Sequence, residues 1–322
     1  MSSGRVVYFN GEFVPESEAK ISIYDSALMF GDMVFEMTRS FNGAQFKLRE
    51  HIDRLFVGLS ILRIEIDLTR DQLEKACLET IERNKPFFAK DDEHRLMIDV
   101  SRGLLGIYQG IEGLEKGSNV IIADFPLRWT VSSMGPLFET GINAVIPSQR
   151  AIPSSLMDPK IKNRSRLFYL MANIEVSSVE GDNNWALLLD TDGFISEGTG
   201  DNFFIVKGNN VITPEGRNIL RGISRNYVLE ELCSETGLIP IEKNIEPYDV
   251  YTADEAFMTG TPFCMLPVTS LNGIDIGDGK VGPVFKKLLR SWGKNVGVDI
   301  EAQIKSWQLL GKNSGPTPYK FR

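Results

Sequence analysis

The sequence predicts an α+β fold in two domains, and three observations support this class. A chain of 322 residues is long enough for two hydrophobic cores. Short strands that turn at Asn-Gly pairs are interspersed with segments of helical periodicity. Between Phe125 and Gly141 this pattern gives way to Pro, Ser and Gly, as in an interdomain connection. We expect a small N-terminal α+β domain over residues 1–128, a connecting loop over 129–141 and a C-terminal domain over 142–322.

Each element expected in the N-terminal domain has a local signal. A hairpin over residues 5–13 turns at Asn10-Gly11, and a second Asn-Gly turn at 42–43 separates two further strands. Helical periodicity follows over 51–64. Thr69 with Gln72 forms a capping box that opens another helix. The expected strands lie at 34–41, 45–48, 95–101 and 118–124, and the inner face of the capped helix holds Leu73, Ala76, Cys77 and Ile81.

The C-terminal domain is predicted from similar signals. A hairpin over 185–196 turns at Asp192-Gly193. Ser224 is placed to open a helix and Gly237 to close it. The chain from about 311 onward is rich in Gly, Pro and Lys, so we expect a frayed tail. The remaining expected elements are a strand near 142–147, a helix from about 164 to 180 and a strand over 202–207.

Composition excludes several classes of protein. The formal net charge is −8 and no basic stripe is present, which argues against a nucleic-acid partner. No apolar run approaches 18 residues, so we expect no membrane span, and the polar N-terminus shows no signal peptide. The three scattered cysteines fit a reducing cytoplasm, and with only two histidines we expect no metal site.

A lysine and an acid point to pyridoxal 5'-phosphate (PLP) chemistry. Lys162 lies just ahead of a helix-like stretch, and Glu197 lies in a strand end bounded by glycines. An amine can form a Schiff base with the cofactor, and a carboxylate can pair with its pyridine nitrogen. Lys160 is also present, and spacing alone does not choose between the two lysines.

Three segments are candidates for holding a phosphate. Gly222 and Ser224 precede a helical stretch, whose first N–H groups and dipole suit an anion. Thr261 lies in a second small, hydroxyl-rich turn, and Arg54 could supply the positive charge. From these residues alone, a simply capped helix and a solvated arginine are the plainer interpretations.

Taken together, these segments resemble the class IV (fold-type IV) PLP aminotransferases. The similar stretches are Tyr24–Glu36, His51–Leu55, Ile195–Asn202, Leu220–Arg225 and Met258–Thr261, and they follow the family order from Arg5 to about Val281. The resemblance implies a smaller N-terminal α/β sandwich and a larger C-terminal α+β pseudo-barrel domain. It also implies a homodimer in which the loop near Phe30 covers the partner's pocket.

The resemblance assigns roles to residues. In two branches of the family a glutamate lies thirteen residues after the catalytic lysine, and counting back from Glu175 gives Lys162. Lys162 is then the Schiff-base and proton-shuttling residue, and Glu197 holds the ring nitrogen protonated. The residues implied for the phosphate are Arg54, Ile223, Ser224 and Thr261. Arg166 stands where a tyrosine often contacts the phenolic oxygen of the cofactor, and Tyr169 lies three residues further on.

The substrate pocket follows the branched-chain pattern only in part. Phe30, Phe35 and Arg39 resemble it, whereas Arg95 and Met97 stand where that pattern has Tyr-x-Arg. Pro262 lacks the backbone N–H that would reach a substrate carboxylate in branched-chain enzymes. The apolar candidates are Phe30, Phe35, Met37, Met97 and Trp129, and the candidates for the carboxylate are Arg39, Arg95, Arg128 and Arg166.

The activity implied is an aminotransferase that moves an amino group from an apolar, branched-chain amino acid to a 2-oxo acid. An R-selective amine or D-amino-acid transaminase is the first alternative, suggested by the lysine-to-glutamate spacing and by Pro262. A PLP lyase of the aminodeoxychorismate type is the second. A non-catalytic PLP carrier is the third.

Overall fold

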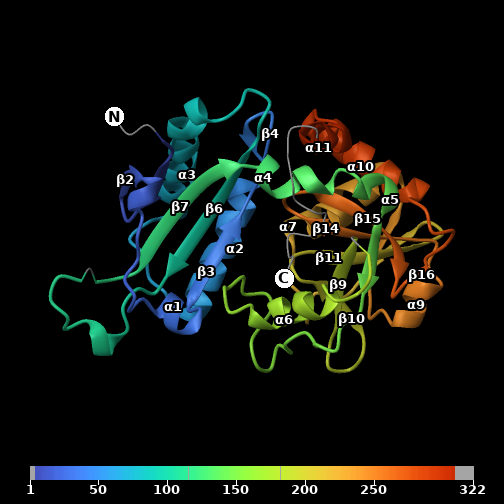
Figure 1. The fold of residues 1–322 in the computed structure, drawn as a ribbon, viewed down its shortest axis with the longest axis horizontal. Coiled ribbons are helices and arrows are strands. Elements are labelled where there is room, and N and C mark those ends of the chain that lie inside the picture. Colours follow the sequence, from blue (N-terminus) through green and yellow to red (C-terminus); the bar gives the residue numbers. More distant parts are fainter. Residues whose placement is uncertain (1–3, 115, 182, 309–322) are drawn as a thin grey trace. The chain divides into compact units, whose positions relative to one another are not determined.

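The computed structural model describes residues 4–114, 116–181 and 183–308, in two compact units (Figure 1). The first unit comprises residues 1–129 and 161–166, and the second comprises 130–160 and 167–322. The segment 161–166 therefore packs with the N-terminal unit, although the sequence places it in the C-terminal domain. The tail expected from about 311 lies outside the described residues.

The segment expected as an interdomain loop over 129–141 contains short helices. They are α4 (Arg128–Val131), the 3₁₀ turn η4 (Ser132–Met134) and α5 (Leu137–Thr140). Leu137 and Phe138 are almost fully buried. Apolar residues between Pro and Gly thus form single helical turns that bury one face. Such turns are too short to be recognised from hydrophobic periodicity.

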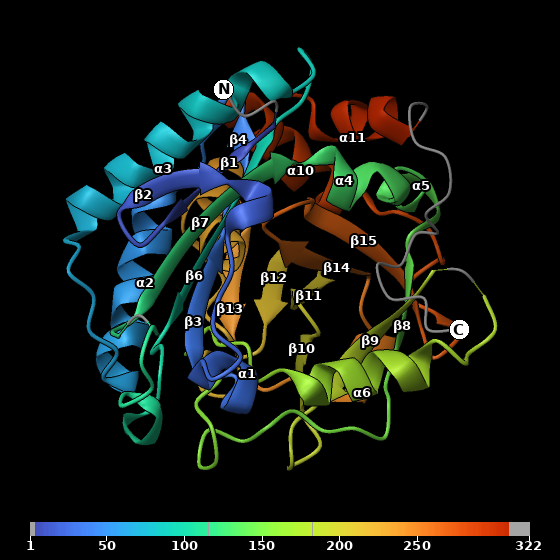
Figure 2. The ribbon, with the colours of Figure 1, turned by 60° about the vertical axis from the view of Figure 1, so that its left-hand side comes forward.

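The first unit is built on a five-stranded antiparallel sheet in the order β2-β1-β7-β6-β3. Two helices, α2 and α3, cover one face of this sheet (Figure 2). Their core forms because alternate strand residues such as Leu96, Ile98 and Val100 point to the helices and are fully buried. The elements are β1 (Val6–Phe9), β2 (Glu12–Pro15), η1 (Glu16–Glu18), α1 (Ser26–Phe30), β3 (Met33–Met37), β4 (Ser40–Phe41), β5 (Ala44–Gln45), α2 (Leu48–Leu62), α3 (Arg70–Asn84), η2 (Lys85–Phe87), β6 (His94–Ser101), η3 (Gly106–Tyr108) and β7 (Asn119–Pro126).

The turn and capping signals in this unit are confirmed. The strand expected over 45–48 is wrong, because β5 ends at Gln45 and α2 already begins at Leu48. Asn10 and Gly11 have φ angles of 50° and 100°, as the tight turn between β1 and β2 requires. The capping box of α3 is complete, because Gln72 N donates to Thr69 Oγ1 (3.3 Å) and Thr69 N donates to Gln72 Oε1 (2.8 Å). The predicted inner face of α3 is buried in the core.

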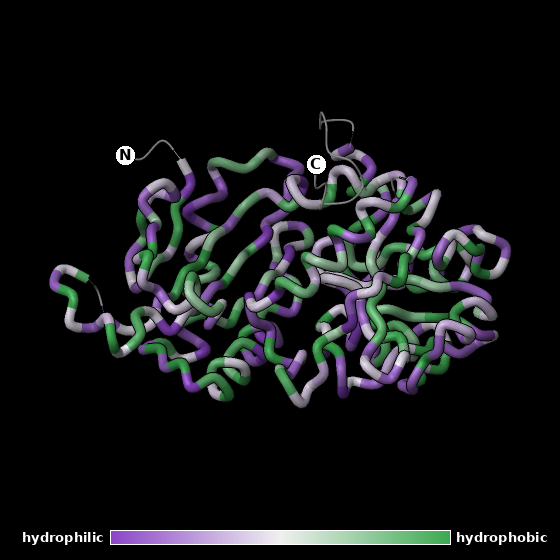
Figure 3. Tube along the Cα trace, turned by 60° about the horizontal axis from the view of Figure 1, so that its bottom comes forward, coloured by the Kyte–Doolittle hydropathy of each residue, from purple (hydrophilic) through white to green (hydrophobic). Residues whose placement is uncertain are grey.

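The second unit contains a ring of strands. The path β10-β9-β8-β15-β14-β11 closes because β10 also pairs with β11. The pairs β8–β9, β8–β15 and β12–β13 are parallel and the others are antiparallel. Figure 3 shows hydrophobic stretches of the tube separated by hydrophilic turns. The strands are β8 (Ile142–Val145), β9 (Asn184–Leu189), β10 (Ile195–Gly198), β11 (Asn202–Lys207), β12 (Asn210–Thr213), β13 (Ile239–Glu242), β14 (Glu255–Gly260), β15 (Cys264–Leu271) and β16 (Ile274–Asp275).

The helix expected from Ser224 to Gly237 contains one wider turn. It consists of α7 (Ile223–Tyr227), a π-helical turn η5 (Val228–Leu232) and α8 (Cys233–Thr236), and Gly237 ends it at φ 68°. Its N-cap is Gly222, so the prediction of a Ser224 cap is wrong by two residues. A Cβ on residue 222 would lie 2.1 Å from Asn202 Oδ1, which leaves no room for a larger cap residue. The other helices are α6 (Leu167–Val176), α9 (Pro247–Tyr251), α10 (Pro283–Val296) and α11 (Ile300–Gln308).

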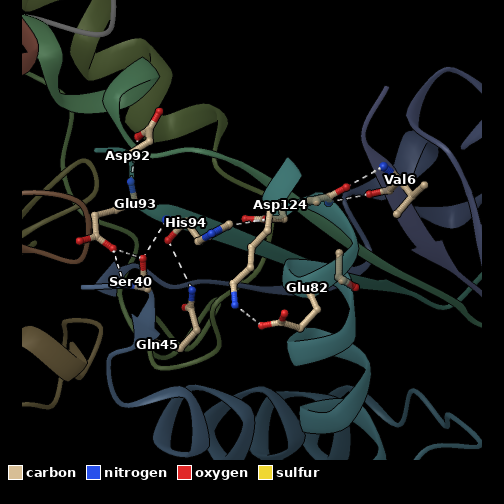
Figure 4. A network of polar contacts seen from close by, with 12 residues as sticks. Val6, Ser40, Gln45, Glu82, Asp92, Glu93, His94 and Asp124 are labelled. Atoms are coloured by element: carbon tan, nitrogen blue, oxygen red, sulfur yellow. Dashed lines mark hydrogen bonds and ion pairs between the residues drawn. The ribbon is translucent and has the colours of Figure 1, made fainter. Parts of the chain in front are cut away.

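A buried polar network holds the small β4–β5 hairpin against the start of β6 (Figure 4). Glu93 accepts from the Ser40 hydroxyl and from the backbone N–H groups of Asn42 and Gly43. The backbone N–H of His94 donates to Ser40 Oγ, and His94 Nδ1 lies 2.8 Å from Asp124 Oδ2. Burial raises the pKa of the Asp124 carboxyl from its ordinary 3.8 to about 6.

The Asp124→Asn variant is expected to change how stability depends on pH. The folded protein binds the Asp124 proton more tightly than the unfolded chain, so this group stabilises the fold below pH 4 and loses that contribution as pH rises to about 6. The loss is at most about 3 kcal/mol. Urea denaturation between pH 4 and 7 should show this fall in the wild type and a flatter profile in the variant. Identical profiles would contradict the assignment.

Candidate active site

Lys162 is fixed against the edge strand of the first unit. Its carbonyl accepts from Phe35 N (2.9 Å), and the next residue, Asn163, forms a bridge with Val34. Lys162 Nζ lies 4.8 Å from the centroid of the Phe35 ring, which is 2% exposed. An amine held against a buried ring is partly desolvated, which suits a nucleophilic lysine.

Lys160 has a different environment. Its ammonium lies 2.7 Å from Asp158 Oδ1 and donates to the carbonyl of Arg217 (3.0 Å), all within the second unit. A lysine whose amine is engaged in an ion pair and a hydrogen bond is less available to attack a carbonyl carbon. The geometry thus separates two lysines that spacing leaves equivalent.

Arg54 belongs to a buried cluster with Glu36 and His51. Glu36, on β3, is fully buried, and its carboxylate accepts from Arg54 Nε (2.6 Å) and Nη2 (2.8 Å). His51 Nδ1 lies 2.7 Å from the same carboxylate. His51 and Arg54 reach Glu36 together because residues three apart share one face of α2. Glu36 and His51 belong to the motifs Tyr24–Glu36 and His51–Leu55, but their pairing with Arg54 was not predicted from the sequence.

The charges in this cluster follow from burial and pairing. Burial alone disfavours the Glu36 carboxylate, but Arg54 and His51 outweigh it and hold the pKa of Glu36 well below its usual range. Burial lowers the pKa of His51 despite the neighbouring carboxylate, so its imidazole is neutral near pH 7. A neutral His51 donates its Nδ1 proton, since a carboxylate only accepts. Arg54 is therefore anchored through one edge of its guanidinium, and its Nη1 edge faces away from Glu36.

The other face of the first sheet carries four of the predicted substrate residues, Phe35, Met37, Arg95 and Met97. Phe35 shares that face with Met37, and Met37 is paired in register with Met97. Arg95 lies two residues from Met97 on the same face, and its Nη2 lies 3.5 Å from Met37 Sδ. Met37, Arg95 and Met97 are all half-buried.

The remaining predicted substrate residues lie elsewhere in the first unit. Arg39 is 1% exposed, donates to Ser40 O and stacks on Phe41. Arg128 donates to Asp91 and Asp92 in two ion pairs. Phe30, on α1, and Trp129 are 65% and 61% exposed. The structure thus groups Phe35, Arg95 and Met97 on this face, and Trp129 stacks on Phe125 beside Arg95 with ring centroids 6.4 Å apart. The contacts described for Phe30, Arg39 and Arg128 lie elsewhere in the unit.

Glu197 is a buried carboxylate of the second unit with three hydrogen-bond donors. It is 4% exposed, and its Oε1 accepts from the Tyr169 hydroxyl at 2.6 Å. Its Oε2 accepts from Leu220 N (3.0 Å) and Asn202 Nδ2 (3.2 Å). Donors of this kind favour the ionised form of a buried acid. Asn202, the last residue of the Ile195–Asn202 motif, was given no role from sequence. It also donates to the Leu220 carbonyl and so ties this acid to the start of α7.

The predicted phosphate residues of the second unit lie at two turns. Ile223 and Ser224 form the first turn of α7, where backbone N–H groups have no partner within the helix. Gly222 lets this turn approach Asn202 closely, because a Cβ atom at position 222 would clash with Asn202 Oδ1. Thr261 follows the end of β14, and the buried Oγ1 of Thr259 on that strand has no hydrogen-bond partner among the described residues. Spare donors at both turns fit a phosphate group.

Comparison with known proteins decides the family. The model of the amino-transferase class IV family matches residues 33–271, which is most of the chain. The chain belongs to the class IV aminotransferases.

Similar proteins extend this class IV assignment over nearly the whole chain. A putative branched-chain-amino-acid aminotransferase of Methanocaldococcus jannaschii is 38% identical over 284 residues, covering 88% of this chain and 93% of the relative. The solved branched-chain aminotransferase of Escherichia coli has a TM-score of 0.80 at 30% identity, covering 91% and 94%. The solved T.th. branched-chain aminotransferase with pyridoxamine 5'-phosphate has a TM-score of 0.81 at 26% identity, covering 95% and 98%.

These findings confirm four predictions. The family, the two-unit α+β fold of type IV, the aminotransferase activity and PLP as the cofactor are as expected for a class IV aminotransferase. Amino-acid and 2-oxo-acid substrates follow from that activity. In the described part of the chain, no helix is long and apolar enough to cross a membrane.

Proposed function

We propose that this class IV aminotransferase moves the amino group of a branched-chain or similar apolar amino acid to a 2-oxo acid. The observation that carries this proposal is the sheet face beside Lys162, where Phe35, Met37 and Met97 form an apolar strip. An aliphatic side chain is stabilised by burial on such a strip. The names of the similar proteins, branched-chain aminotransferases, support the same substrate class.

The cofactor roles are assigned residue by residue. PLP supplies an aldehyde that carries the amino group and a ring that withdraws electrons when it is protonated. Lys162 Nζ takes the proton from the donor's Cα and returns one to the acceptor's carbon. Glu197 holds a proton at the ring nitrogen. Arg54, Ile223, Ser224 and Thr261 bind the phosphate, and Arg166 is the remaining residue assigned to the cofactor.

The assembly proposed is a cytoplasmic homodimer. Leu28 and Phe30 on α1 are more than 60% exposed, which is unusual for large apolar side chains on a monomer surface. The buried cysteines Cys77, Cys233 and Cys264 form no disulfide among the described residues, which suits a reducing compartment. Sedimentation of a stable monomer would argue against the dimer.

A donor panel tests the substrate class. L-leucine is expected to exceed D-alanine and (R)-1-phenylethylamine in kcat/KM by at least about tenfold with 2-oxoglutarate or pyruvate as acceptor. Faster turnover of either of the other donors would instead support the D-amino-acid or R-amine alternative. Product formation without any acceptor would support the lyase.

A further inference from the structure

Three cations surround the ring of Phe35. Arg164 Cζ lies 3.7 Å from the ring centroid, Lys162 Nζ 4.8 Å and Arg166 Cζ 5.6 Å. Phe35 itself is almost fully buried. A guanidinium stacked on an aromatic face is held in one plane, so its N–H groups point in fixed directions.

Asp99 fixes the orientation of Arg164. Nε and Nη2 of Arg164 both donate to a single oxygen, Asp99 Oδ1, at 3.2 and 2.9 Å. No hydrogen bond from Arg164 Nη1 to another described residue is present, and the side chain of Arg164 is 32% exposed. One edge of the guanidinium is therefore anchored, and the other can still bind an anion from solvent.

Arg164 and Lys162 are two residues apart, on either side of Asn163, which bridges to Val34. Side chains at such spacing leave the backbone on the same side, and both here reach the ring of Phe35. In an α-amino acid the carboxylate is bonded to the carbon that carries the amine. A group that binds this carboxylate must therefore lie near the reactive lysine, and Arg164 Cζ and Lys162 Nζ lie 3.7 and 4.8 Å from the same ring centroid.

We propose that Arg164 binds the carboxylate of the amino acid substrate and that Asp99 is its positioning residue. This inference rests on the proposed function, in which Lys162 is the reactive lysine. It gives the site a preference for amino acids over amines of the same carbon skeleton. Arg164 was not among the substrate residues predicted from sequence, because its contact with Asp99 spans 65 residues.

The test compares ligands that differ only in the carboxylate. The holoenzyme is titrated by calorimetry with 4-methylpentanoate and with 4-methylpentanol. The wild type should prefer the acid, and Arg164→Gln should reduce that preference about 10- to 100-fold while leaving alcohol affinity unchanged. Asp99→Asn should reduce the preference by a smaller factor, because Arg164 keeps its charge but loses its anchor.

A second Arg–Asp pair supplies the matched control. Arg102 donates to both oxygens of Asp32 in the same unit, and Arg102→Gln should keep the full preference for the acid. The double variant Asp99→Asn/Arg164→Gln avoids an unpaired buried acid and should lose the preference as Arg164→Gln does. If the single and the double Arg164 variant both keep the full preference for the acid over the alcohol, the inference is overturned. The proposed function would still stand if the wild type takes up PLP and turns over leucine. Failure of the wild type to take up PLP removes both.

Discussion

Replacing Lys162 by alanine is expected to abolish transamination, lowering kcat by a factor of roughly 10⁴ or more. The amine of Lys162 is the attachment point for the cofactor and the carrier of the transferred proton in the proposed function. The segment 161–166 holds no second primary amine, because its other basic residues, Arg164 and Arg166, carry guanidinium groups. Steady-state assays with L-leucine measure the loss.

Lys160→Ala is the matched control for this variant. It removes the same number of atoms two residues away, and it breaks the contacts of Lys160 with Asp158 and the Arg217 carbonyl. These contacts are partly exposed, so we expect a small loss of stability, below about 1 kcal/mol, and retained turnover. A Lys162→Ala enzyme that still transaminates, or a Lys160→Ala enzyme that does not, would contradict the assignment.

Glu36→Gln is expected to destabilise the protein by about 3–5 kcal/mol. Glutamine keeps the shape of the side chain but leaves Arg54, which is 13% exposed, without its buried counter-charge. His51 also loses its charged acceptor. Urea denaturation measures the change. Glu79→Gln is the control, because Glu79 pairs with Arg83 on the exposed face of α3 and should contribute less than about 0.5 kcal/mol.

The same variant should weaken cofactor binding through the phosphate. Glu36 fixes the guanidinium of Arg54, so loss of Glu36 should reduce affinity for PLP more than affinity for pyridoxal, which has no phosphate. Equal losses for both vitamers would mean that Glu36 supports the fold without orienting a phosphate-binding arginine. The comparison is made by titration of the apoprotein at a temperature well below its unfolding transition.

Local sequence signals predicted those features that depend only on residues close together in the chain. The Asn10-Gly11 turn and the Thr69–Gln72 capping box each depend on residues close in the chain, and both formed as predicted. The Ser224 cap failed because Asn202, 20 residues earlier, selects Gly222 by close approach. The bounds of that helix were otherwise close to the prediction.

The contacts that organise the candidate site are not local, and this is why sequence reasoning missed them. Glu36 lies on a strand and meets Arg54 only when α2 packs on that strand. Tyr169 reaches Glu197 across 28 residues, and Arg164 reaches Asp99 across 65. Motifs identify the residue types that chemistry needs, whereas the partners that orient them depend on which elements pack together.

The most direct measurement locates the cofactor on the chain. The holoenzyme is reduced with borohydride, which fixes PLP to the lysine that carries it, and is then digested and analysed by mass spectrometry. We expect one pyridoxyl group, on Lys162. A label on Lys160 or on any other lysine, or no label at all, would contradict the central claim that Lys162 is the reactive residue.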